Sequence, residues 1–146
     1  MDNDGYRLAL LKDRETLERA LLFWKSMFRM CDWDIALRFV SRASFCERER
    51  AGEADIDVQH RKAIISVVDE RDIAESEHPD WPLDRKLVLA HEFAHVLLWA
   101  VPIPDQEQNP MGHHLYEQTI QTIATGISAM TDWKFLQKAG RRSRNV

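Results

Sequence analysis

The chain of 146 residues has the size of one domain, since single domains commonly contain about 100 to 200 residues. Its content of 45% hydrophobic and 30% charged residues is typical of a globular protein and argues against collagen-like, disordered and membrane-embedded classes. The formal net charge of −4 has the wrong sign for an electrostatic nucleic-acid binder and is too small for a DNA mimic. We therefore expect no nucleic-acid partner.

The two cysteines and the N-terminal segment bear on location. Cys31 and Cys46 show no CxxC or other ligand spacing, so we expect reduced thiols rather than a disulfide or a cysteine zinc site. The first residues carry acids where a secretory signal needs positive charge, and the longest apolar stretch is interrupted by titratable residues. These features predict a cytoplasmic protein with no membrane partner.

In chain order, the first predicted element is a helix over residues 13–30. Its apolar residues recur at spacings of three and four, which marks one buried face formed by Leu17, Ala20, Leu21, Trp24, Met27 and Phe28. Three strands are predicted at 33–40, 52–58 and 62–68, the last two as a hairpin around residues 59–61. The charged stretch 69–80 is expected to form a loop or a short exposed helix.

The next predicted helix, over residues 80–100, is apolar on nearly every side, which places it at the centre of the domain. Asp80 is its expected N-cap, followed by Pro82 in the first turn. A proline-containing loop over 101–114 then leads to a helix over 114–130. The predicted apolar face of that helix consists of Leu115, Thr119, Ile120, Ile123, Ala124 and Ile127.

The end of the chain is expected to complete the core and then leave it. Trp133, Phe135 and Leu136 are predicted to pack on the core, and residues 137–146 to form a basic, mobile tail. The order of one helix, three strands and two helices predicts an α+β fold in a single domain over residues 1–136.

The central predicted helix carries an HExxH motif at residues 91–95. His91 and His95 are about 40° apart around the helix axis and one turn apart along it, so both imidazoles can bind one ion. Glu92 projects about 100° further round, where it can act as general base for a water activated by Zn²⁺. Because the flanking residues are apolar, these polar side chains would be costly to bury without a partner, and a metal ion provides one.

A catalytic zinc site usually has a third protein ligand. Glu117 is the preferred candidate, because it lies on the second predicted helix and a helix holds a ligand more rigidly than a proline-rich loop. His113 and His114 are alternatives, either as the third ligand or as hydrogen-bond donors to the developing oxyanion. The loop acids Asp105 and Glu107 complete the set of candidates.

Two further residues near Glu117 are candidates for supporting roles. Tyr116 is another candidate oxyanion donor, although a tyrosine at a helix start more often packs against the core. Gln121 lies one turn beyond Glu117 and is a candidate for orienting the metal ligands, with a solvated side chain as the alternative.

The runs LVLAHEFAHVLLW and YEQTIQTIATGI together resemble small gluzincin-type metallopeptidases, particularly phage-type and ImmA/IrrE-like proteins, in which a downstream Glu completes an HExxH domain. The resemblance covers residues 32–130, and its specific parts are the two predicted helices that carry these runs. It implies a minimal zincin-like fold, with His91, His95 and Glu117 as zinc ligands and Glu92 as base. It also implies that a sheet edge, with 62–68 as the candidate strand, binds an extended peptide by strand addition.

These features predict a zinc-dependent peptidase that hydrolyses peptide bonds in a narrow set of intracellular proteins, its partner being a protein or peptide substrate. The alternative is a non-catalytic, zinc-stabilised binding module, such as a phage or mobile-element protein that acts on a host factor. The two hypotheses differ at Glu92, which only the peptidase requires.

Overall fold

The computed structural model describes residues 13–45, 50–73 and 83–131. In chain order, the elements are α2 (Asp13–Met27), β1 (Asp34–Val40), the short 3-10 helix η1 (Arg42–Ser44), β2 (Gly52–Asp57), β3 (Lys62–Val68), α3 (Glu70–Ile73), α4 (Arg85–Leu97) and α5 (Pro110–Met130). Helices and a three-stranded sheet together confirm the predicted α+β class. The predicted packing of Trp133, Phe135 and Leu136 and the predicted tail over 137–146 lie outside the described residues.

The sheet has the strand order β1-β3-β2. β2 and β3 form the predicted antiparallel hairpin, with Ala54 opposite Ile65, and β1 runs parallel to β3. The expectation that residues 62–68 form a sheet edge is therefore wrong, because β3 is the central strand. Its nearly continuous apolar sequence KAIISVV is typical of a strand with neighbours on both sides. The edge beside α4 belongs to β2, which contacts that helix.

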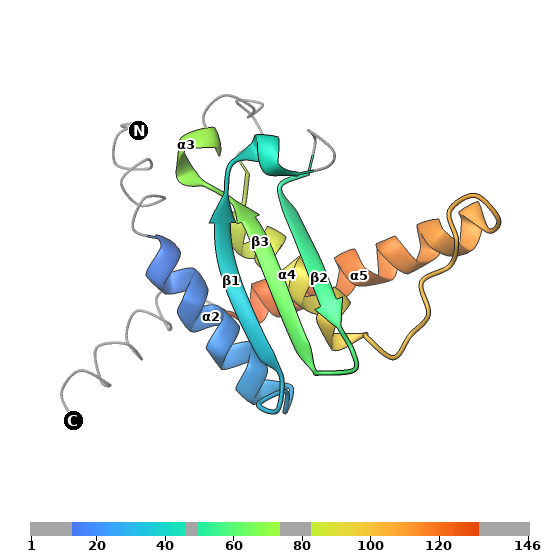
Figure 1. Cartoon of the computed structure of the whole chain (residues 1–146), viewed down its shortest axis with the longest axis horizontal. Helices are drawn as coiled ribbons and strands as arrows, with labels where there is room; N and C mark the ends of the chain where they lie inside the picture. The colour runs from blue at the N-terminus through green and yellow to red at the C-terminus, as the bar shows by residue number, and fades with distance from the viewer. Residues whose placement is uncertain (1–12, 46–49, 74–82, 132–146) are drawn as a thin grey trace.

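The helices α2 and α4 lie behind the sheet in the view of Figure 1, and α5 extends from behind it to the right. α4 contacts β2, β3, α2 and α5, which confirms the prediction that this helix is central. Its apolar side chains and those of α2 and β3 form the core, with Leu17, Trp24, Ile65, Leu89 and Phe93 among the largest residues. Within the described residues, no helix combines the length and apolar character needed to cross a membrane.

Several predicted helix limits and faces are corrected by the structure. α2 ends at Met27, whose side chain is 40% exposed rather than buried, and the chain then turns through Arg29 with φ of 56°. α4 begins at Arg85 instead of near residue 80, because the side chain of Asp84 caps it by accepting hydrogen bonds from the amides of residues 86 and 87. Asp80 and Pro82, the predicted cap and first turn, lie outside the described residues.

α5 begins four residues before the predicted start, at Pro110, with Asn109 as its N-cap. This helix also has a slightly different apolar face from the predicted one. Leu115 and Thr119 are exposed, whereas Tyr116 is buried.

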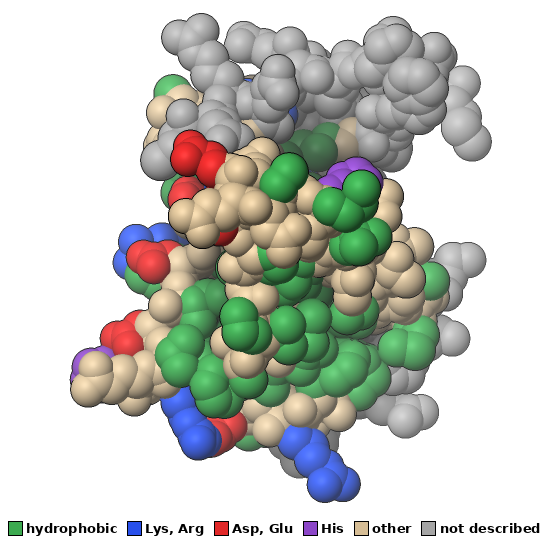
Figure 2. Space-filling view, turned by 90° about the vertical axis from the view of Figure 1, so that its right-hand side faces the viewer, with side chains coloured by type: hydrophobic (Ala, Val, Ile, Leu, Met, Phe, Trp, Pro, Cys, Tyr) green, Lys and Arg blue, Asp and Glu red, His purple; other side chains and the backbone are tan. Residues whose placement is uncertain are grey.

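The face of the molecule in Figure 2 carries a broad area of hydrophobic side chains.

A partly buried ion-pair network joins α3 to α2 and α4. The Glu70 carboxylate pairs with Arg14 at 2.7 Å and with Arg85 at 3.2 Å, and the Arg85 side chain is completely buried. Both guanidinium groups also lie over the ring of Phe39 on β1. Burial acts to raise the pKa of Glu70, but hydrogen bonding with Arg14 and the charge of Arg85 outweigh it and lower the pKa from 4.5 to about 2.

We expect Glu70→Gln to lower the free energy of unfolding by about 3 kcal/mol near pH 7, because it removes the carboxylate that pairs with buried Arg85. Since the folded-state pKa is lowered, this stabilisation is present above pH 4.5 and is lost as pH falls toward 2. Urea unfolding near pH 7 and near pH 2 measures this effect. The difference in the free energy of unfolding between parent and variant should be smaller near pH 2. Glu15→Gln, which breaks the exposed pair with Arg19, is the matched control, and equal losses in both variants would contradict the prediction.

Candidate metal centre

The packing of α5 on α4 brings together the residues predicted to bind metal. Tyr116 and Ile120 of α5 are buried in a cluster with Ala94 of α4, which sets the rotation of α5 about its axis. Glu117 follows Tyr116 and is therefore turned about 100° from it, toward the side of α4 that carries the HExxH histidines. The spacing along each helix and this one helix-helix contact build the site.

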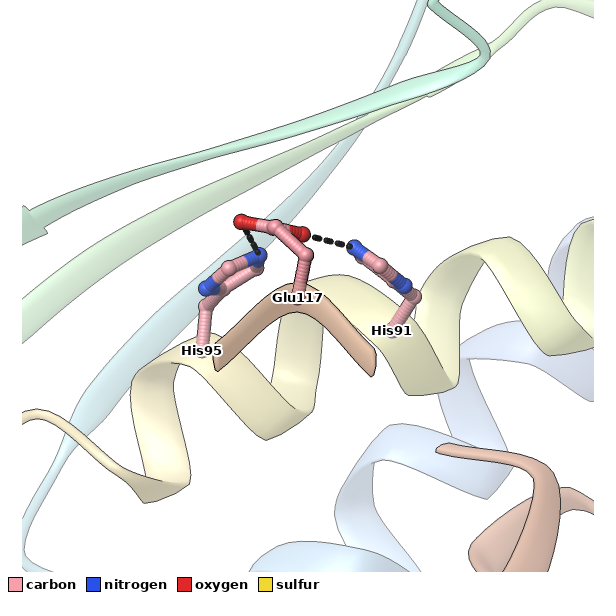
Figure 3. A group of neighbouring side chains, drawn as sticks. All are labelled: His91, His95 and Glu117. Carbon is pink, nitrogen blue, oxygen red and sulfur yellow. Dashed lines mark ion pairs between the residues drawn. The ribbon is translucent and has the colours of Figure 1, made fainter. Parts of the chain in front are cut away.

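The imidazoles of His91 and His95 point toward the carboxylate of Glu117 (Figure 3). His91 Nε2 lies 3.5 Å from Glu117 Oε2, and His95 Nε2 lies 3.8 Å from Glu117 Oε1. One ligand atom from each of the three residues falls within 4.8 Å of the others. Donors about 2.0 to 2.1 Å from a tetrahedral zinc ion lie about 3.3 Å apart, so the two histidine-carboxylate distances are close to this spacing, and the three residues would hold three of four positions once their ligand atoms moved closer together.

The second nitrogen of each histidine has a partner on α5. Nδ1 of His91 lies 2.8 Å from Oε1 of Gln121, and Nδ1 of His95 lies 3.4 Å from the hydroxyl oxygen of Tyr116. With a proton on Nδ1, each ring donates to its partner and leaves the Nε2 lone pair free for a metal. Gln121 thus lies within hydrogen-bonding distance of His91, as its candidate role in orienting a metal ligand requires.

Gln121→Ala should weaken zinc binding about 10-fold to 100-fold, because it removes the acceptor that fixes the tautomer and orientation of His91. Competition with a chromophoric zinc chelator measures this affinity. Gln118→Ala is the matched control, since Gln118 is exposed on the same helix, and it should bind zinc as the parent does. Equal affinities for both variants would show that Gln121 does not orient the ligand.

Glu92 is buried, with 9% of its surface exposed, and lies on α4 between the two histidines in sequence. It lines the same cleft as the three candidate ligands and is not one of them. Burial raises its pKa from 4.5 to about 7, partly offset by the nearby charges of His91 and Arg50. A carboxyl group with a pKa near neutrality is suited to accept and release a proton.

The environment of His95 also favours metal binding. Burial lowers the pKa of His95, against the opposing charge of Glu117. A lower pKa keeps the imidazole neutral, which is the form that binds a metal.

An open cleft of about 880 Å³ contains these groups. One wall is the first part of β2 with Arg50 before it, another is the side of α4 that carries His91, Glu92 and His95, and a third includes Ile103 and His113. The walls mix apolar and charged side chains, as is usual for a ligand-binding cleft.

The remaining predicted site residues occupy different places. Tyr116 lies behind His95, where its hydroxyl group meets Nδ1, so it does not occupy the predicted oxyanion position. His113 lines the cleft, and its Nδ1 lies 3.1 Å from the carbonyl oxygen of Pro104, so it can offer a proton from Nε2 only when positively charged. His114 is exposed and does not line the cleft.

The two loop acids are not brought to the centre. Asp105 accepts hydrogen bonds from the amides of Glu107 and Gln108, and these bonds lower its pKa. Glu107 is exposed, and within the described part of the chain the only group able to hold a metal consists of His91, His95 and Glu117.

Sequence reasoning missed the contribution of β2. Gly52 and Arg50 line the cleft, although they are more than thirty residues away from the HExxH motif. The one available signal was a glycine at the start of a predicted strand, where no tight turn calls for it. Gly52 lies close to Val88 and Glu92 because β2 approaches α4, and local sequence does not encode this approach.

Comparisons with known proteins identify no relative of the chain. No protein-family model, no curated protein and no solved structure matches the chain. The chemistry assigned to the centre therefore depends on the residues and distances described above.

Proposed function

We propose that the protein is a zinc-dependent peptidase with a zincin-like site of the gluzincin type. The observation that carries this proposal is the convergence of two imidazole Nε2 atoms and one carboxylate in an open cleft that also contains buried Glu92. A purely structural zinc site usually has four protein ligands and is closed to solvent. Three ligands beside a cleft and a titratable carboxylate favour a catalytic site.

His91, His95 and Glu117 would hold the ion, and Gln121 and Tyr116 would fix the orientation of the two imidazoles. A bound Zn²⁺ ion would supply Lewis acidity and lower the pKa of water at its open position toward neutrality. Its positive charge would also lower the pKa of Glu92 and favour the carboxylate, the form that accepts a proton. Glu92 then accepts the proton of the attacking water and later donates it to the leaving amine of the cleaved peptide.

The edge of β2 supports an extended peptide as the substrate. β2 pairs with β3 along one side only within the described residues, and its first half lines the cleft beside Glu92. A substrate strand beside β2 could add main-chain hydrogen bonds to the sheet, which would align a peptide bond with the centre. Apolar side chains at Leu87 and Ile103 would contact its side chains.

The direct test uses metal-free protein reloaded with increasing zinc and a mixture of peptides derived from proteins of many sequences. Mass spectrometry should detect new peptide ends whose amount rises with zinc up to one equivalent per chain, and a chelator should stop their formation. Stoichiometric zinc binding without any cleavage would contradict a peptidase and favour the zinc-stabilised binding module.

A further inference from the structure

Gly52, the first residue of β2, is buried where the strand passes α4. None of the described glycines has a positive φ, so backbone conformation does not require glycine here. The space around residue 52 does require glycine. A Cβ atom at residue 52 would lie 2.6 Å from Cγ1 of Val88, 3.0 Å from Cγ of Glu92 and 3.2 Å from Oε1 of Glu92. These distances are shorter than ordinary van der Waals contacts, which begin near 3.4 Å.

The position of the Glu92 carboxylate depends on packing. Within the described residues, the Glu92 side chain makes no hydrogen bond and no ion pair. The backbone of β2 passes close to this side chain at Gly52, where an added Cβ atom would meet both Cγ and Oε1 of Glu92. A carboxylate held without hydrogen bonds is displaced readily when a neighbouring atom intrudes.

We propose that Gly52 is a positioning residue for Glu92: the missing side chain leaves the space that Glu92 and Val88 occupy, and so sets where the carboxylate lies in the cleft. The inference rests on the proposed function, since it takes Glu92 as the general base. It adds that the strand expected to bind the substrate also sets the location of the base. The strand β2 would then position both the substrate backbone and the Glu92 carboxylate.

Gly52→Ala tests this inference in the full chain. We expect the variant to bind one equivalent of zinc and to lower kcat about 10-fold to 100-fold with little change in KM, because a displaced base affects the chemical step more than substrate binding. The matched control is Gly126→Ala on α5, where a Cβ atom meets nothing within 4 Å. The control should retain the parental kcat and should not unfold more readily.

A second variant separates the two contacts at residue 52. The double variant Gly52→Ala/Val88→Ala removes the 2.6 Å contact between residue 52 Cβ and Val88 Cγ1 and keeps the contacts with Glu92. Its kcat should stay well below that of Val88→Ala alone. Recovery to the value of Val88→Ala would show that Gly52 accommodates Val88 and does not position the base.

Crystal structures of metal-free parent and Gly52→Ala provide a readout that does not depend on activity. We expect the distance from residue 52 Cβ to Glu92 Cγ to open from 3.0 Å to at least 3.4 Å by movement of the Glu92 side chain. A shift of β2 or Val88 with Glu92 unmoved would overturn the inference. If zinc-loaded parent protein cleaves no peptide, the proposed function fails, whereas an active parent with a fully active Gly52→Ala variant overturns this inference alone.

Discussion

Glu92→Gln should retain one zinc ion per chain and lower kcat for peptide hydrolysis about 100-fold to 10,000-fold, because glutamine keeps the shape of the side chain and cannot accept the proton. The free energy of unfolding should not fall. Burial raises the pKa of Glu92 to about 7, so the charged carboxylate is itself destabilising in the metal-free fold and its neutral replacement is not. Elemental analysis, urea unfolding and single-turnover cleavage measure the three quantities.

Glu107→Gln is the matched control for this variant, since it makes the same chemical change at an exposed loop position outside the cleft. It should cleave peptides at the parental rate. If Glu92→Gln cleaved as fast as this control, Glu92 would not be the base. If it lost zinc as well as activity, Glu92 would belong among the ligands.

Glu117→Ala should weaken zinc binding by more than about 100-fold, which exceeds the effect expected for a residue that only orients a ligand. The reason is that its carboxylate is the one group that lies near Nε2 of both histidines. Because a ligand that binds only the folded state stabilises it, zinc at about 100 times the parental Kd should stabilise the parent by about 2.7 kcal/mol and the variant much less. Chelator competition and thermal unfolding with and without zinc provide both measurements.

Two histidine variants decide between the candidates for the third ligand. His114→Ala is the control and should bind zinc normally, because His114 is exposed and outside the cleft. His113→Ala should also retain zinc, because His113 is not one of the three converging residues. A large loss of zinc in His113→Ala together with a small loss in Glu117→Ala would make His113 the third ligand and contradict the assignment.

The candidate site could be predicted from the sequence where helical periodicity determines it. The spacing of His91 and His95 places both imidazoles on one side of any α-helix that contains them, and α4 does contain them. Glu117 could be chosen because it lies on a helix, and the structure brings its carboxylate near both histidines. Local geometry is sufficient for the two histidines, whereas the place of Glu117 also requires the packing of α5 on α4.

Features that depend on the order of strands or on the exact rotation of a helix could not be predicted in this way. The sequence of residues 62–68 reads as a strand but does not say which strands flank it, and the structure makes β3 central. The sequence left two roles open for Tyr116, as an oxyanion donor or as a packing residue, and only the rotation of α5 buries it beside Ala94 and brings its hydroxyl oxygen 3.4 Å from Nδ1 of His95. Gly52 acquires its contacts only when β2 meets α4.

A crystal structure of the zinc-loaded chain, with anomalous data collected on both sides of the zinc absorption edge, tests the central claim most directly. We predict one anomalous peak about 2.0 to 2.2 Å from Nε2 of His91, Nε2 of His95 and a carboxylate oxygen of Glu117, with an open position on the Glu92 side of the cleft. Zinc bound elsewhere, or a fourth protein ligand that closes this position, would contradict it.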